Sequence, residues 1–170
     1  TLLEVLYDAG EWDRSLEAAE RLSHERDHRL ATVDSPELIA GQIHLWRGDR
    51  SRARSLLTLA NADEARAIGD LQYVAPWLVG AAMGRFDDGD HGTALDLIDE
   101  MREITSDNPR WRCSELQNAV RILVALDEID LAERLVPAEP LRMTRSELVR
   151  RTSAALVSGA RGDSHHAAAS

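Results

Sequence analysis

The chain has 170 residues, 44% of them hydrophobic, which is an ordinary share for a globular domain with a continuous core. It has 20 basic and 30 acidic residues, and the resulting formal net charge of −10 disfavours direct binding of nucleic acid. No apolar run approaches the roughly 18 residues of a membrane-spanning helix, so we expect no membrane segment and no membrane partner. Cys113 is the only cysteine, which excludes an internal disulfide and favours the cytoplasm.

Apolar residues recur every three or four positions along the chain, and period-2 strand patterns are close to absent. Leu16, Ala19 and Leu22, for example, share one helical face, with acidic residues opposite. The sequence therefore predicts an all-α fold. In chain order, the predicted helices lie near 1–9, 12–26, 35–47, 50–67, 72–87, 91–105, 109–126, 130–136 and 145–160.

Several of the predicted helices begin with a sequence pattern that is typical of a helix N-terminus. Pro36 and Pro109 each follow a capping residue, an order that favours proline at the first helical position. The segment 144–147 has the spacing of a capping box. Two starts remain open for the helix over 72–87, one at Pro76 and an earlier one at Asp70.

A short turn motif recurs between these helices. A glycine, an acidic residue and a small residue five positions after the glycine appear together every 35 to 41 residues, a period typical of helical solenoids. The glycine and acidic pairs are Gly10-Glu11, Gly48-Asp49, Gly89-Asp90 and Gly162-Asp163, with a degenerate copy at Asp127-Glu128. The small residues are Ser15, Ala53, Ala94, Ala167 and, in the degenerate copy, Ala132.

Each position of the motif has a physical role. Glycine ends the first helix because it accepts positive φ without steric cost. The acidic residue begins the next helix, where its charge favours the positive end of the dipole. We expect the small residue to let the two helix backbones approach closely. A second small position lies seven residues before the glycine, at Gly41, Ala82 and Ala155, although Leu3 and Val120 depart from it.

This pattern resembles the tetratricopeptide repeat. The best copy runs from Ser35 through Gly41, Gly48 and Ala53, and the next runs from Pro76 through Ala82, Gly89 and Ala94. The resemblance implies a right-handed α-α superhelix of antiparallel helix pairs forming one domain over 1–170. Its repeats would lie near 1–27, 35–68, 72–106 and 109–137, and another would begin within 144–170.

The segment LLEVLYDAGEWDRSLEAAERL is also similar to the repeat regions of large actinobacterial signalling proteins. Those proteins join a nucleotide cyclase or a helix-turn-helix domain to a regulatory ATPase and a tail of such repeats. The chain begins at Thr1 inside a helical pattern, and 164–170 resembles a helix just begun. We therefore expect a piece of a larger cytoplasmic protein that regulates signalling or transcription.

In this repeat architecture the first helices of successive repeats line a concave groove that binds a partner. The partner would be a protein, a peptide or another domain of the same chain, and no cofactor or metal is implied. A mixed apolar and polar groove suits an amphipathic helix or an extended peptide, with Arg121 facing an acidic group. The predicted groove residues are Leu38, Gln42, Leu45, Trp46, Val79, Met83, Phe86, Gln117, Arg121 and Val124.

Two alternatives remain. His24, Glu25 and His28 form an HExxH string, which in a zinc-dependent hydrolase holds the metal and supplies a base. Arg26 and Asp27 are charged where such enzymes keep apolar residues, and no third ligand is apparent, so we expect a solvated helix end and no enzyme. The other alternative is self-association through the apolar ends of the chain. For Cys113, ordinary burial is favoured over a nucleophilic role.

Overall fold

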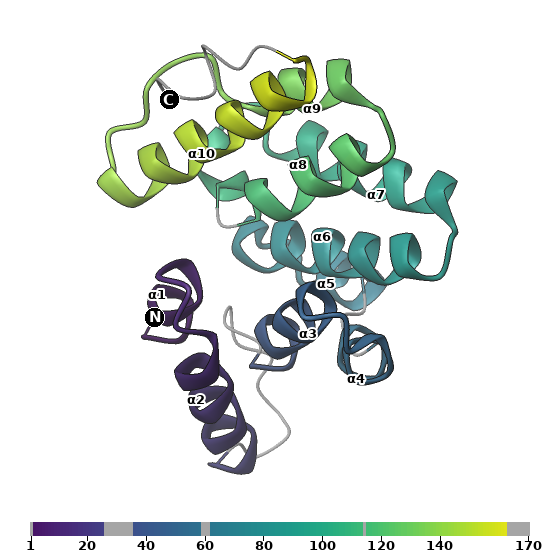
Figure 1. Cartoon of the computed structure of the whole chain (residues 1–170), viewed down its shortest axis with the longest axis vertical. Coiled ribbons are helices and arrows are strands. Elements are labelled where there is room, and N and C mark those ends of the chain that lie inside the picture. The colour runs from purple at the N-terminus through teal and green to yellow at the C-terminus, as the bar shows by residue number, and fades with distance from the viewer. Residues whose placement is uncertain (1, 26–35, 59–61, 114, 163–170) are drawn as a thin grey trace.

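The computed structural model describes residues 2–25, 36–58, 62–113 and 115–162 (Figure 1). Helices account for all the regular structure in these ranges, which confirms the predicted all-α class. The elements are α1 (Leu2–Asp8), α2 (Trp12–Glu25), α3 (Pro36–Trp46), α4 (Arg50–Leu57), α5 (Ala62–Ile68), α6 (Leu71–Asp87), α7 (His91–Ile104), the 3-10 helix η1 (Pro109–Arg112), α8 (Leu116–Ala125), α9 (Ile129–Leu135) and α10 (Thr144–Ala160).

The structure departs from the predicted helices at two places and decides a third that was left open. The helix expected over 50–67 is two helices, α4 and α5, and the one expected over 109–126 begins as η1 and continues as α8. Of the two starts left open for α6, the earlier one is present, because the Asp70 side chain accepts a hydrogen bond from the Gln72 amide at 3.0 Å. Pro76 therefore lies inside α6.

The capping box expected at 144–147 is also different. Met143 occupies the N-cap of α10, and its side chain makes no capping hydrogen bond. The Glu147 carboxylate instead accepts hydrogen bonds from Arg150 and from the backbone amide of Leu141, and these contacts lower its pKa to about 2. Glu147 thus fixes the chain that leads into α10.

Tight turns with the same hydrogen bonds join α1 to α2, α3 to α4, α6 to α7 and α8 to α9. Gly10, Gly48 and Gly89 have φ of 75°, 82° and 79°, and Asp127 has φ of 61° in the degenerate copy. In all four turns, the backbone amide of the acidic residue that follows donates a hydrogen bond to the carbonyl five residues before it, as in a Schellman C-cap. These bonds are Glu11 to Leu6, Asp49 to His44, Asp90 to Arg85 and Glu128 to Leu123, at 2.8–3.0 Å.

The small residue of the motif is buried in all four turns. Ser15, Ala94 and Ala132 have no exposed surface, and Ala53 is 1% exposed. Each of their amides donates to the carbonyl of the acidic residue four positions earlier, which closes the first turn of the second helix. The fifth copy has Gly162 at φ of 80°, while Asp163 and Ala167 lie outside the described residues.

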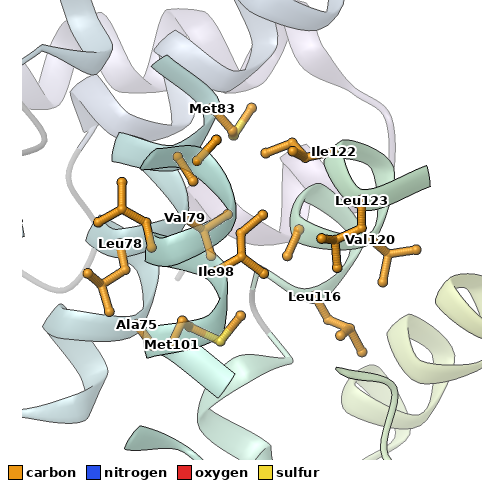
Figure 2. Close-up of a cluster of buried hydrophobic side chains, with 14 of the residues drawn as sticks. Ala75, Leu78, Val79, Met83, Ile98, Met101, Leu116, Val120, Ile122 and Leu123 are labelled. Carbon is orange, nitrogen blue, oxygen red and sulfur yellow. The ribbon is translucent and has the colours of Figure 1, made fainter. Parts of the chain in front are cut away.

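These turns stack the helix pairs around two apolar clusters. The larger extends from α3 to α10 and is centred on α6, α7 and α8, where Val79, Met83, Ile98 and Leu123 interlock (Figure 2). The smaller is formed mainly by α1, α2 and α3. Helix α3, with α4 beside it, therefore contributes to both clusters and connects α1 and α2 to the rest of the chain.

Arg112 in η1 ties α8 to its neighbours. Its guanidinium is buried and donates to the Thr105 carbonyl after α7 and to the Leu135 carbonyl at the end of α9, both at 3.1 Å. Burial lowers the pKa of Arg112. A cation at two helix C-termini satisfies carbonyls that have no partner within their own helices.

We expect Gly89→Ala to lower the free energy of unfolding by about 1–2 kcal/mol, because alanine at positive φ brings its Cβ against the backbone. Gly92→Ala is the matched control, since a Cβ at Gly92 in α7 would meet no atom within 4 Å. It should be neutral or stabilise by up to about 1 kcal/mol through helix propensity. Urea unfolding of both variants measures the difference, and equal effects would contradict the role of the turn.

We expect Ala94→Leu to cost about 1–3 kcal/mol, because a larger side chain must displace packed neighbours at a fully buried position. Ala125→Leu, on the exposed surface of α8, should change stability by less than about 0.5 kcal/mol. Thermal unfolding of the two variants provides the comparison. A tolerated Ala94→Leu would show that the close approach of α6 and α7 does not depend on a small residue.

Candidate functional site: a polar cluster on the inner face

The first helices of the pairs lie in a curved row. Helix α1 contacts α3, α3 contacts α6, α6 contacts α8, and α8 contacts α10. The row bends so far that α1 comes close to α10 (Figure 1). Side chains of α1 form hydrogen bonds with α8 and α10. We call the surface where α1, α3, α8 and α10 meet the inner face.

Asn118 of α8 is the centre of the inner face. Its Oδ1 accepts hydrogen bonds from the Tyr7 hydroxyl of α1 at 3.2 Å and from the Trp46 indole of α3 at 3.0 Å. Its Nδ2 donates to Glu115 Oε2 at 3.0 Å. One amide therefore joins three helices, and Tyr7 is 111 residues away from it in the sequence.

Glu115 is buried beside Asn118 at the N-cap of α8. Its Oε2 also accepts a hydrogen bond from Gln42 Nε2 of α3 at 2.8 Å. Burial raises the pKa of Glu115 to about 8, and the nearby charges of Glu4 and Asp8 act in the same direction. The bonds from Asn118 and Gln42 oppose this shift, but both donors are neutral amides, so the fold favours the protonated form of the carboxyl group.

An ion-paired layer closes the inner face above this cluster. Arg145 at the start of α10 lies 3.1 Å from the Glu4 carboxylate and 2.5 Å from the Asp8 carboxylate, both on α1. Tyr7 lies between Glu4 and Asp8 in the sequence of α1. Burial and the nearby Glu115 raise the pKa of its hydroxyl to about 12. Its hydroxyl is therefore a hydrogen-bond donor and not an ionising group.

Arg121 is one turn beyond Asn118 on the same helix. Its guanidinium lies over the Trp46 ring, 5.2 Å from the centroid, in a cation–π contact. Among the described residues it forms no ion pair with a carboxylate. Stacking holds the guanidinium flat, while its N–H edge stays free to bind an acceptor.

The predicted groove residues divide into two groups. Leu38, Gln42, Val79 and Met83 are buried, with exposed fractions of 4%, 1%, 0% and 0%, so their assignment to an open groove is corrected. They lie on the side of α3 and α6 that packs against neighbouring helices. The other six are partly exposed: Leu45, Trp46, Phe86, Gln117, Arg121 and Val124.

The sequence analysis did not single out Tyr7, Glu115, Asn118 or Arg145. A signal for two of them was present, because Glu115 and Asn118 interrupt the apolar pattern around Leu116, Ala119 and Val120 at helical spacing. Polar residues on the buried side of a helix predict a hydrogen-bonded network. No local pattern pairs them with α1.

The HExxH alternative lies at the edge of the described chain. His24 is exposed in the last turn of α2, while His28 lies outside the described residues. Within the described ranges, no group of three or more histidine, cysteine or acidic side chains is arranged to hold a metal ion.

Cys113 is buried, as expected, and its thiol donates a hydrogen bond to the Pro109 carbonyl at 3.4 Å. Burial raises the pKa of this thiol to about 11, which disfavours the reactive thiolate. No described helix combines the length and the apolar character that crossing a lipid bilayer requires.

Two surface hollows lined by described residues lie away from the inner face. One of about 250 Å³ lies between α2, α3 and α4 and includes His24, His44 and Leu56. Another of about 220 Å³ lies between α4 and α6, where Arg54 pairs with Asp88 at 2.6 Å. Both are shallow, and in the second the Arg54 guanidinium is already held by Asp87 and Asp88.

Comparisons with known proteins give no match, whether to a family model, a curated protein or a solved structure. The function is therefore inferred from the chemistry of the residues alone.

We expect stability to depend on pH through Glu115. Its pKa is raised from 4.5 in the unfolded chain to about 8 in the fold, so the folded state binds a proton more tightly. This contribution is complete below pH 4.5, decreases as pH rises and is lost above about 8. Glu115→Gln keeps a neutral acceptor for Gln42 and Asn118, and should exceed the wild type in stability by about 2 kcal/mol or more at pH 9.

Urea unfolding of both proteins from pH 5 to pH 9 measures this dependence. The difference between them should be smallest near pH 5 and grow with pH. Glu20→Gln, at an exposed position of α2, is the control and should follow the wild type at every pH. A constant difference between Glu115→Gln and the wild type would contradict a protonated Glu115.

Proposed function

We propose that the chain is a protein-interaction module of the tetratricopeptide-like kind, and that it binds a peptide or a partner domain on its inner face. In this proposal it belongs to a larger cytoplasmic protein that regulates signalling or transcription. The observation that carries the proposal is the Arg121–Trp46 stack, which presents on a curved row of helices a guanidinium that has no ion pair within the described part of the chain.

The chemistry of this surface suits recognition. A stacked guanidinium can make two parallel hydrogen bonds to one carboxylate, which gives both geometry and affinity. Gln117, one helical turn before Arg121, adds an amide, and Val124 adds apolar surface. An acidic side chain flanked by apolar residues therefore fits this patch, while the net charge of −10 repels extended polyanions such as nucleic acid.

The repeated turn supports a solenoid of tetratricopeptide-like units. Four turns share one hydrogen-bond pattern, and each buries a small residue at the same offset. The first helices of successive pairs contact one another in order, which is the arrangement that creates an extended binding surface in repeat proteins. The exposed residues of this row then determine which partner binds, whether that partner is a separate protein or another domain of the same chain.

The zinc-dependent hydrolase is not carried forward, because no observation on the described residues favours it. Among the residues of the HExxH string, His24 is exposed at a helix end. Self-association is tested together with partner binding, since sizing of the purified chain by light scattering distinguishes a monomer from a dimer.

We expect Arg121→Glu to weaken partner binding by 10-fold or more, because truncating or reversing a central arginine at an interface costs about 2 kcal/mol. Arg134→Glu on α9 is the matched control, with the same change of charge at an exposed site. A photoreactive residue in place of Gln117 captures the partner covalently in cell extract, and titration with the purified partner then gives the affinities.

The proposal predicts a crosslinked partner whose binding is lost in Arg121→Glu and kept in Arg134→Glu. Equal loss in both variants would show that only the overall charge matters. Retained binding in Arg121→Glu would place the partner on another surface. A crosslink to a second copy of the chain would assign the inner face to self-association.

A further inference from the structure

Two different kinds of contact attach α1 to the rest of the molecule. Its buried apolar residues, Leu3 and Leu6, belong to the smaller cluster, whose other members come from α2, α3 and, through Leu56, the end of α4. Its contacts with α8 and α10 are polar, through the Tyr7 hydroxyl and the carboxylates of Glu4 and Asp8. The apolar contacts therefore fix α1 on α3, and the polar contacts decide whether the inner face is closed.

Glu115 lies where these polar contacts converge. The charges that act on it come from Glu4 and Asp8 on α1, and Tyr7 of the same helix lies near it. Arg121, on its own helix, acts on Tyr7 and is stacked on Trp46. Arg145 is already shared between Glu4 and Asp8. Ionisation of Glu115 would thus place a third negative carboxylate near Glu4 and Asp8, which already share a single arginine.

The remaining neighbours cannot compensate for that charge. From α3 come the uncharged Gln42 and Trp46, since Glu37 accepts a hydrogen bond from Ser23 and His44 lies 3.4 Å from Asp49. The part of α6 between positions 74 and 83 contains no ionisable residue. Burial of an ionised carboxylate with only neutral donors is unfavourable, so the charged form favours access to water.

We propose that the inner-face cluster is a proton-linked brace: loss of the proton from Glu115 separates α1 from α8 and opens the inner face. In the closed state the neutral carboxyl accepts from Gln42 and Asn118, and Asn118 in turn holds Tyr7. When Glu115 ionises, repulsion from Glu4 and Asp8 and hydration of the new charge both favour release of Tyr7. The helix pair α1–α2 then swings about its apolar contact with α3.

This brace regulates the surface for which partner binding is proposed. Opening exposes the indole of Trp46 and the amide of Asn118, which widens the patch beside Arg121. Because the brace is a property of the chain alone, it is measured without a partner. Failure of the brace and failure of partner binding are therefore separate outcomes.

The experiment measures one distance across the inner face at several pH values. Spin labels are placed through Glu17→Cys on α2 and Arg151→Cys on α10, both exposed positions, with Cys113→Ala removing the native thiol. Double electron–electron resonance then gives the distance distribution from pH 6 to pH 9. A second labelled pair, Glu103→Cys with Arg151→Cys, reports on α7 and α10 within the larger cluster and serves as the control.

We expect the distance between α2 and α10 to shift to longer values as pH rises, with a midpoint near 8. The same pair in Glu115→Gln should stay at the short distance throughout, and the control pair should not change. An unchanged distance in the wild-type background, or an equal shift in Glu115→Gln, would overturn the brace.

A direct titration keeps the inference testable if a labelled variant does not fold. The side-chain carboxyl carbon of Glu115 in the unmodified chain is followed by ¹³C NMR, with assignment from its loss in Glu115→Gln. A titration well above the ordinary range of glutamate supports the brace. A pKa near 4.5 would overturn it, because the carboxyl group would then be charged in the closed state at neutral pH.

Discussion

The left-handed turn between paired helices is the constraint on which the rest of the structure depends. At Gly10, Gly48 and Gly89 the chain reverses at positive φ, and the next amide returns to a carbonyl five residues earlier. This fixes where the second helix begins, so that its small residue faces the first helix. Because that residue is serine or alanine, the two helices can approach each other closely. This close approach in turn lets the helix pairs stack.

The curvature of that stack creates the polar cluster. Because α1 meets α8 across the inner face, groups that would be hydrated on a flatter row of helices are removed from water. Their burial is tolerated since Asn118 uses both its oxygen and its nitrogen in bonds to Tyr7, Trp46 and Glu115. A network of this kind favours one arrangement of the helices, because any other leaves buried polar atoms without partners.

The same surface combines a closed part and an open part. Glu115 and its amide donors lie inside, whereas Arg121 on its indole platform lies at the edge. Both are on α8, within two helical turns of each other. Events that move α1 away from α8 therefore change the environment of the arginine for which a partner carboxylate is proposed.

The sequence by itself determined most of the helices, the turns and the positions of close approach. Apolar period and glycine placement are local properties, and the buried Ser15, Ala53, Ala94 and Ala132 follow from them directly. Sequence signals did not decide between the two possible starts of α6, at Asp70 and at Pro76.

Only the tertiary structure decided which side chains face inward and what they meet. Leu38 and Met83 entered the core, while Glu115 and Asn118 became the centre of a cluster with Tyr7. The physical reason is that small rotations between successive helix pairs add up along the stack. The contact between α1 and α8 depends on that sum, and no pattern within a single repeat encodes it.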